Sequence, residues 1–266
     1  MSKQSARVQM HFAHANGFPS GSYRAVFDAL DNQIKVLSKP HFASEQTFKH
    51  DRNWHTLVNE LIHYCEQFKH ADIPLWAVGH SMGAIVSFKA CCERPDLFDG
   101  LIMFDPPLVT GPFAPLLRAA KKTAAIDKIT PASLSAVRRS YWHKSEDPVA
   151  YFKSKALFKN MDDKCIADYV DSGLVSKGEG RELVIKAATE AQLFRHVPDD
   201  LNRLNGMLQC PGVLVTGRAS DVCRPIMYRR FVKRHNMRHT VAEGGHMFPL
   251  EHPKATATLL NQLLLE

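Results

Sequence analysis

Short apolar runs alternate with longer amphipathic stretches along most of the chain. This alternation predicts an α/β fold whose sheet is mostly parallel. Strands are indicated where several apolar residues lie together, and helices where apolar residues recur every three to four positions. Strands are predicted over residues 8–13, 34–37, 75–78, 101–104, 213–216 and 240–242. Helices are predicted over residues 23–30, 54–68, 84–92, 225–234 and 254–265. We therefore expect a sheet of about six strands flanked by helices.

The pattern changes between the fourth and fifth predicted strands. About a hundred residues pass there with amphipathic segments but no convincing strand. One helix in this stretch is expected over Arg181–Phe194, because its apolar residues fall on one side. We interpret the stretch as an all-helical insertion over residues 109–210, which divides a core formed by residues 1–108 and 211–266.

Composition places the chain close to the average soluble globular protein, with 45% hydrophobic and 23% charged positions in 266 residues. No apolar run is long enough to span a bilayer, and the first residues lack the apolar core of a secretory signal. The six cysteines include no Cys-x-x-Cys pair, which argues against a metal or redox site. We expect a cytoplasmic protein with buried thiols, no metal and no cofactor.

The formal net charge of +7 raises the question of an anionic partner. Much of the excess falls in the last quarter of the chain, and the helix predicted over residues 225–234 is basic. A solvated outer face explains this pattern best, and a docking patch for an anionic partner is the alternative. Because no nucleic-acid motif accompanies the charge, nucleic-acid binding is not expected.

The sharpest motif is Gly79-His80-Ser81-Met82-Gly83, which lies between a predicted strand and a predicted helix. In that context the G-x-S-x-G pattern places a serine on a sharp turn. Glycine is favoured two residues to either side, since larger side chains would clash with the turn. Ser81 is therefore the candidate nucleophile at the carboxyl end of its strand.

A serine hydroxyl is too weakly acidic to attack unaided, so a histidine base and a carboxylate that orients the histidine are required. His246 follows the last predicted strand, and the glycines before it let its loop fold over the sheet edge. The acid should lie between serine and histidine in the sequence. Asp221, just beyond the fifth predicted strand, is favoured, and Asp105, at the end of the fourth, is the alternative.

Acyl transfer also needs N–H donors directed at the developing oxyanion. Met82 supplies one donor by its position directly after the nucleophile. The other should come from the turn after the first strand, where Asn16 is favoured and Gly17 or Phe18 are alternatives. His14 in the same turn is interpreted as a turn-stabilising side chain that bonds to the backbone.

Together, the turn at residues 14–21, the serine motif, the turn at 217–221 and Gly245-His246 resemble the α/β-hydrolase superfamily over nearly the whole chain. The resemblance implies a mostly parallel sheet, a Ser-His-Asp triad and no cofactor. It also implies that the insertion over residues 109–210 is a cap, with a pocket for a small acyl substrate between it and the core. Members usually have two further strands before the turn at residues 14–21, in addition to the one predicted here over residues 8–13, and we expect this chain to lack that N-terminal hairpin. His14-Ala15 also replaces the usual His-Gly dipeptide.

These observations predict a serine hydrolase that cleaves a carboxylic ester or thioester through an acyl-enzyme. Two alternatives stay open. One is hydrolysis or formation of a C–C bond, in which Arg138, Arg139 and Trp142 would bind a carboxylated or aromatic substrate. The other is a protein that keeps the fold and senses a ligand without turnover.

Overall fold

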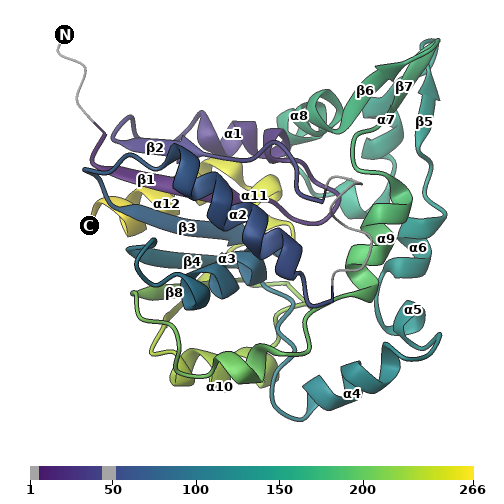
Figure 1. Ribbon diagram of the computed structural model, residues 1–266. Coiled ribbons are helices and arrows are strands. Elements are labelled where there is room, and N and C mark those ends of the chain that lie inside the picture. The colour runs from purple at the N-terminus through teal and green to yellow at the C-terminus, as the bar shows by residue number, and fades with distance from the viewer. Residues whose placement is uncertain (1–5, 44–51) are drawn as a thin grey trace, which may run out of the picture.

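A six-stranded parallel sheet forms the centre of the computed structural model, which describes residues 6–43 and 52–266 (Figure 1). The strand order is β2-β1-β3-β4-β8-β9, so β3 and β4 lie in the middle. The strands are β1 (Val8–Ala13), β2 (Ile34–Leu37), β3 (Leu75–His80), β4 (Gly100–Phe104), β8 (Gly212–Gly217) and β9 (Arg238–Ala242). All six strands predicted from the sequence are confirmed, with differences only at their ends.

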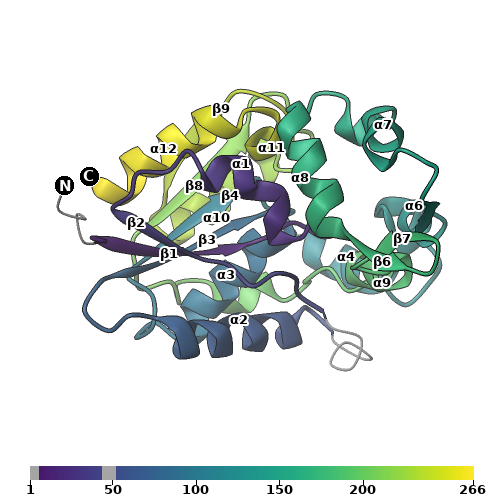
Figure 2. The same cartoon turned by 90° about the horizontal axis from the view of Figure 1, so that it is seen from above.

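Helices cover both faces of the sheet (Figure 2). One face carries α2 (His55–Phe68), α3 (Met82–Glu93) and α10 (Pro225–Arg234), and the other carries α1 (Arg24–Phe27) and α12 (Pro253–Leu265). Successive strand residues alternate between the two layers. In β3, Ala77 packs with the first group of helices and Val78 with the second. Two apolar layers therefore hold the sheet from both sides.

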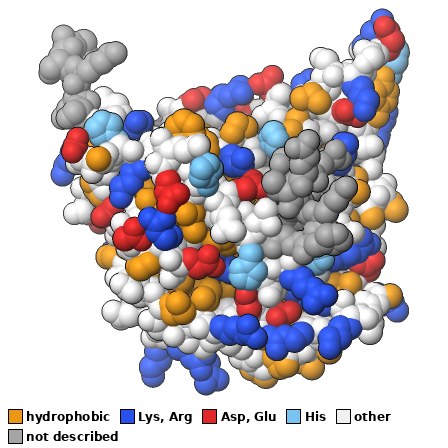
Figure 3. Space-filling model, viewed as in Figure 1, with side chains coloured by type: hydrophobic (Ala, Val, Ile, Leu, Met, Phe, Trp, Pro, Cys, Tyr) orange, Lys and Arg blue, Asp and Glu red, His pale blue; other side chains and the backbone are white. Residues whose placement is uncertain are grey.

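The helices form where the apolar spacing predicts them. In α2 the buried side chains recur along one stripe, as expected for an amphipathic helix packed on a sheet. Its buried residues are Leu57, Val58, Leu61 and Cys65. The helix α10 has the predicted bounds, and its basic side chains are exposed. Lys and Arg gather along the lower edge of the face in Figure 3, where Figure 1 places α10 and α4 (Phe113–Ala120).

The segment between β4 and β8, residues 105–211, is called the insertion below. Its helices are α4, α5 (Ile126–Ile129), α6 (Ala132–Ala136), α7 (Pro148–Lys153), α8 (Asp163–Gly173) and α9 (Ala187–Arg195). It also contains an antiparallel sheet of β5 (Tyr141–His143), β6 (Leu174–Lys177) and β7 (Gly180–Leu183). The expectation of an all-helical insertion is therefore wrong.

The helix expected over Arg181–Phe194 shows why the hydrophobic pattern did not predict these strands. Its first residues belong to β7, and only α9 is helical. The strand is short and mostly half-buried, so it has no continuous apolar run. Gly178 makes the turn before it with a φ of +54°, and a Cβ on Gly180 would lie 2.1 Å from the Trp142 carbonyl oxygen. These glycines mark a tight hairpin.

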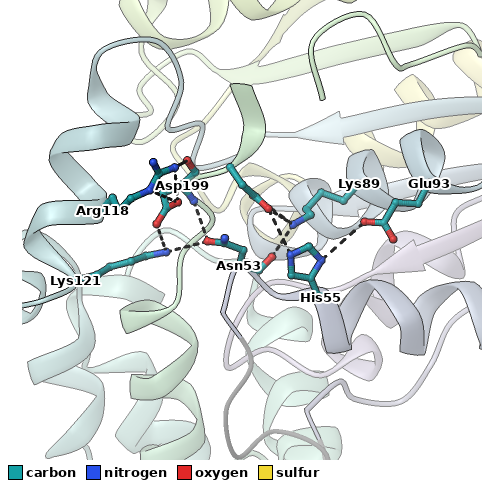
Figure 4. Close-up of polar contacts among 8 residues, drawn as sticks. Asn53, His55, Lys89, Glu93, Arg118, Lys121 and Asp199 are labelled. Carbon is teal, nitrogen blue, oxygen red and sulfur yellow. Dashed lines mark hydrogen bonds and ion pairs between the residues drawn. The ribbon is translucent and has the colours of Figure 1, made fainter. Parts of the chain in front are cut away.

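Charged side chains fasten the insertion to the core (Figure 4). Lys89 of α3 is buried, and its ammonium donates to both Asp200 carboxylate oxygens, at 3.3 and 3.1 Å, and to the Asn53 carbonyl at 2.8 Å. Next to Asp200, Asp199 pairs at 3.0 Å with Lys121, the residue after α4. Lys121 also donates to the Asn53 side chain at 3.0 Å. The end of the insertion is thus tied to α3 and to the residues that precede α2.

No helix in the described ranges is both long enough and apolar enough to cross a membrane. The six cysteines are unpaired thiols, and all but Cys210 are fully buried. This agrees with the thiols expected from the sequence.

Candidate active site

The candidate nucleophile and a carboxylate lie on neighbouring strands at the carboxyl edge of the sheet. Ser81 follows β3 and Asp105 follows β4. The Ser81 N–H donates to the Phe104 carbonyl at 2.8 Å, and the Asp105 N–H donates to the Val215 carbonyl at 2.8 Å. The hydrogen-bond ladder thus continues one residue past each strand, which fixes both backbones at the edge.

The turn that carries Ser81 depends on two glycines. Ser81 has φ +55° and ψ −114°, a backbone conformation that L-residues rarely adopt. A Cβ on Gly79 would lie 2.2 Å from the Gly83 carbonyl oxygen, and a Cβ on Gly83 would lie 2.0 Å from the Ala13 carbonyl oxygen. Both positions therefore require glycine because backbone segments approach each other there. This is the sharp turn that the sequence predicts.

Ser81 and His246 meet as the sequence predicts. The Ser81 hydroxyl donates to His246 Nε2 at 3.1 Å. The other ring nitrogen, Nδ1, donates to Asp105 Oδ2 at 2.7 Å. Serine, imidazole and carboxylate therefore form one continuous line of hydrogen bonds, as required of a base-activated nucleophile.

The carboxylate beside the histidine belongs to Asp105, so the preference for Asp221 needs correction. The Asp221 side chain is exposed, and only the backbone carbonyl of this residue accepts a bond from Arg224 Nε, at 2.9 Å. The turn after β8 instead directs its donors at Asp105, which is completely buried. The Gly217 N–H donates to Asp105 Oδ1 at 3.0 Å, and the Ser220 hydroxyl donates to Oδ2. Three donors, including His246, thus surround the Asp105 carboxylate.

The turn after β1 lies against the beginning of α3. Asn16, Ser81 and Met82 line the same cavity. Met82 is the first residue of α3, where backbone N–H groups have no partner within the helix. The Asn16 side chain donates to the Glu190 carbonyl at 3.0 Å, so the insertion holds this turn. Asn16 and Met82 are therefore close to the candidate nucleophile, where the sequence predicts the oxyanion donors.

His14 stabilises the turn, as predicted. Its Nδ1 donates to the Ala15 carbonyl at 2.8 Å, and its Nε2 accepts from the Phe42 N–H at 3.0 Å. Burial lowers the pKa of His14 to about 4, so the ring is neutral near pH 7.

Two functional neighbours of the serine were missed by sequence reasoning. Tyr23 and His80 are both fully buried, and Tyr23 Oη lies 2.7 Å from His80 Nδ1. His80 Nε2 lies 2.8 Å from the His246 carbonyl oxygen. His80 occupies a variable position of the serine motif, and Tyr23 is an aromatic residue in a predicted helix. Neither carries a signal that a single sequence would distinguish from ordinary packing.

A cavity of about 970 Å³ opens in front of Ser81 and His246. It lies between the core and the insertion, and its wall is mainly apolar. Representative lining residues are Phe18, Phe113, Leu117, Phe158, Phe194 and Met247. The wall therefore suits an apolar group next to the reactive hydroxyl.

The residues considered for a carboxylated or aromatic substrate do not form a free binding site. Arg138 lines the cavity, but it pairs with Glu190 and donates to Tyr169 Oη at 2.7 Å. Arg139 also lines the cavity, and it pairs with Glu146. Trp142 is buried among aromatic side chains of the insertion. Within the ranges described, no cluster of three or more His, Cys, Asp or Glu residues is arranged to hold a metal ion.

Comparisons with known proteins place this geometry in a family. Residues 12–259 match the Alpha/beta hydrolase family. A monoglyceride lipase homologue of monkeypox virus is 23% identical over 214 residues, which are 75% of this chain and 74% of that protein. Four further curated relatives align over 38% of their own length or less.

Solved structures agree in fold. E-2-(acetamidomethylene)succinate hydrolase superposes with a TM-score of 0.77 at 18% identity, over 98% of this chain and 92% of that one. The thioesterase domain from the curacin biosynthetic pathway superposes with a TM-score of 0.72 at 17% identity, over 96% and 90%. With a family match over most of its length and this arrangement of strands, the chain belongs to the alpha/beta hydrolase family and is a hydrolase.

Proposed function

We propose that the protein is a serine hydrolase that cleaves carboxylic esters or thioesters with an apolar acyl group. The observation that carries this proposal is the line of hydrogen bonds from Ser81 through His246 to Asp105, which opens on the apolar cavity. The similarity to a monoglyceride lipase homologue supports an ester as the substrate. Most of the insertion, about residues 109–210, acts as the cap that shapes the pocket.

In the first half of the reaction, Ser81 Oγ attacks the carbonyl carbon while His246 Nε2 takes the hydroxyl proton. Asp105 stays ionised and stabilises the imidazolium that forms. The negative charge on the carbonyl oxygen is held by the backbone N–H groups of Met82 and Asn16. His246 then gives its proton to the departing alcohol or thiol, which leaves an acyl group on Ser81.

In the second half, water takes the place of the leaving group. His246 removes a proton from the water as it attacks the acyl carbon, and then returns a proton to Ser81 Oγ as the acid departs. The apolar wall lowers the polarity around the oxyanion, which strengthens its contacts with the N–H donors. The two halves together consume one ester or thioester and one water.

Covalent labelling tests the nucleophile. A fluorophosphonate probe should label the wild-type protein, and Ser81→Ala should lose both labelling and about 10⁶-fold in kcat. Ser87→Ala is the matched control, since Ser87 is buried in the same helix, α3, and should label normally. Equal labelling of wild type and Ser81→Ala would refute the proposal.

Substrate panels then define the bond that is cleaved. We expect turnover of 4-nitrophenyl esters and of matched acyl thioesters, with kcat/KM rising with acyl chain length as the apolar cavity fills. Labelling by the probe without turnover of either panel would favour C–C bond chemistry or ligand sensing instead.

A further inference from the structure

A series of hydrogen bonds connects three segments of the candidate site: the turn after β1, the turn that carries Ser81 and the loop that carries His246. It runs from the Ala15 N–H to Tyr23 Oη at 3.2 Å, from Tyr23 Oη to His80 Nδ1 at 2.7 Å, and from His80 Nε2 to the His246 carbonyl at 2.8 Å. Ala15 precedes Asn16, and His80 precedes Ser81. These hydrogen bonds therefore join the turn after β1 (the oxyanion turn), the turn that carries Ser81 (the serine turn) and the loop that carries His246 (the histidine loop).

The direction of every bond in this chain is fixed by its ends. The Ala15 N–H can only donate, so Tyr23 Oη accepts it and has its own proton available for His80. At the other end, the His246 carbonyl oxygen can only accept, so His80 Nε2 carries the ring proton and donates it. In the neutral ring Nδ1 then accepts, and it receives the Tyr23 hydroxyl proton. One tautomer of His80 satisfies the whole chain.

The surroundings keep this tautomer neutral. Burial lowers the pKa of His80 to about 3, with the nearby His246 contributing, so the ring carries a single proton across the working pH range. Tyr23 is completely buried, packs against Phe12 at 4.6 Å between ring centroids, and has its pKa raised by burial. Its hydroxyl therefore stays protonated.

Backbone contacts hold the loop that carries His246 just before the histidine. The Gly244 carbonyl accepts from the Ala219 N–H at 2.9 Å, and the Gly245 N–H donates to Glu251 at 2.8 Å. The Asp105 carboxylate holds the imidazole at Nδ1. At the His246 carbonyl itself the partner is the His80 N–H, which therefore fixes the backbone at the histidine.

We propose that Tyr23 and His80 are positioning residues of the active site: Tyr23 donates to His80 Nδ1 and so stabilises the tautomer with the proton on Nε2, and the His80 N–H holds the His246 carbonyl in place beside Ser81. Neither residue touches the reacting atoms. The inference rests on the proposed function, since it assigns the support of the base in that reaction. Loss of either residue should lower kcat more than it changes KM.

Two amide substitutions test the roles of the two ring nitrogens of His80 separately. Glutamine places its N–H group close to the position of Nε2, so His80→Gln keeps a donor for the His246 carbonyl. Asparagine places its oxygen close to the position of Nδ1, so His80→Asn keeps only an acceptor for Tyr23. We expect His80→Gln to retain kcat within about threefold of wild type and His80→Asn to lose at least about 30-fold, with KM within about twofold in both.

A double-mutant cycle tests the tautomer directly. Tyr23→Phe should lower kcat about tenfold in the wild-type background, because the tautomer with the proton on Nε2 then loses the donor to its buried Nδ1. A glutamine has no such choice, so in the His80→Gln background the same change should cost about threefold or less. Equal costs in the two backgrounds would overturn the proposal, and so would His80→Asn activity equal to that of His80→Gln.

The readouts distinguish this inference from the proposed function and from a general loss of stability. The rate of fluorophosphonate labelling at Ser81 should fall in parallel with kcat, while failure of the wild type to label would refute the hydrolase mechanism itself. His235→Gln is the control, since His235 is also buried but packs against Phe88 and Phe231 at the end of α10. It should change the unfolding temperature but not kcat. If the losses of kcat merely followed the unfolding temperature across all variants, the proposed positioning role of Tyr23 and His80 would be refuted.

Discussion

At the scale of single residues, Asp105 and Asp221 differ in what surrounds their carboxylates. Asp105 is completely buried and accepts hydrogen bonds from His246, Gly217 and Ser220. Asp221 is exposed. A buried carboxylate with three donors is a fixed partner for an imidazole, whereas an exposed one is not.

This difference predicts opposite results for two matched substitutions. Asp105→Asn should lower kcat about 1,000- to 10,000-fold, because the amide presents N–H or a weaker acceptor to His246 Nδ1 and disfavours the required tautomer. Asp221→Asn should leave kcat within about twofold. Steady-state kinetics with a 4-nitrophenyl ester measure both. The reverse result would restore Asp221 as the acid.

Part of the site could be read from the sequence because its signal is local. The serine turn needs glycine at two fixed spacings, and His246 stands out because glycines precede it after the last strand. The acid depends on how the turn after β8 folds back on β4, a contact between residues more than a hundred positions apart. Strand order alone left both aspartates possible, and side-chain contacts decided between them.

At the scale of elements, the insertion is held by charges that are mostly out of solvent. The Lys89 ammonium lies between the Asn53 carbonyl and Asp200, and its side chain is 1% exposed. Asp199 continues the same network to α4 through Lys121 and Arg118 (Figure 4). The cap is therefore tied to α3, the helix that begins at the nucleophile.

Breaking the buried pair should destabilise the fold. Asp200→Asn leaves the Lys89 charge without its counter-ion, and we expect the free energy of unfolding to fall by about 3 kcal/mol. Glu179→Gln is the control, because the Lys144–Glu179 pair is about 70% exposed and its loss should cost less than about 0.5 kcal/mol. Urea unfolding measures both. Equal costs would mean that the network around Lys89 contributes no more than a surface pair.

The elements also show where hydrophobic pattern is informative. The four inner strands of the central sheet are buried on both faces, so they appear as compact apolar runs. The edge strands β2 and β9 have exposed positions, and they were also predicted. The strands of the insertion form a small sheet with exposed positions, and β6 has only its first residue buried. Their tertiary pairing, rather than their own sequence, determines their conformation.

At the scale of the whole molecule, several histidines are buried as neutral rings. Burial lowers the pKa of His11 and His80 to about 3 and that of His14 to about 4, from an ordinary value of 6.5. In the unfolded chain the same groups bind protons near pH 6.5. Between pH 6.5 and 4 the unfolded state therefore holds more protons than the folded state.

Stability should consequently fall as the solution becomes acidic. Each of these histidines should reduce the free energy of unfolding by about 1 to 2 kcal/mol between pH 7 and pH 5. Urea midpoints at the two pH values measure the effect. His11→Phe, which fits between aromatic neighbours, should remove about one third of the difference that the three histidines cause. An unchanged midpoint at pH 5 would contradict this account.

Ser81 and Asp105 share one feature with a wider consequence: both hold a positive φ, +55° and +43°, although neither is glycine. Holding a residue other than glycine in this backbone conformation lowers the stability of the fold by on the order of 1–3 kcal/mol at each position. At Ser81, a change to glycine would relieve this cost and stabilise the fold, and the same change would end the proposed chemistry. At Asp105 the relief would be offset by the loss of the three hydrogen bonds that its carboxylate accepts. Selection for stability and selection for turnover therefore oppose each other at Ser81, where only continued demand for the reaction keeps the serine.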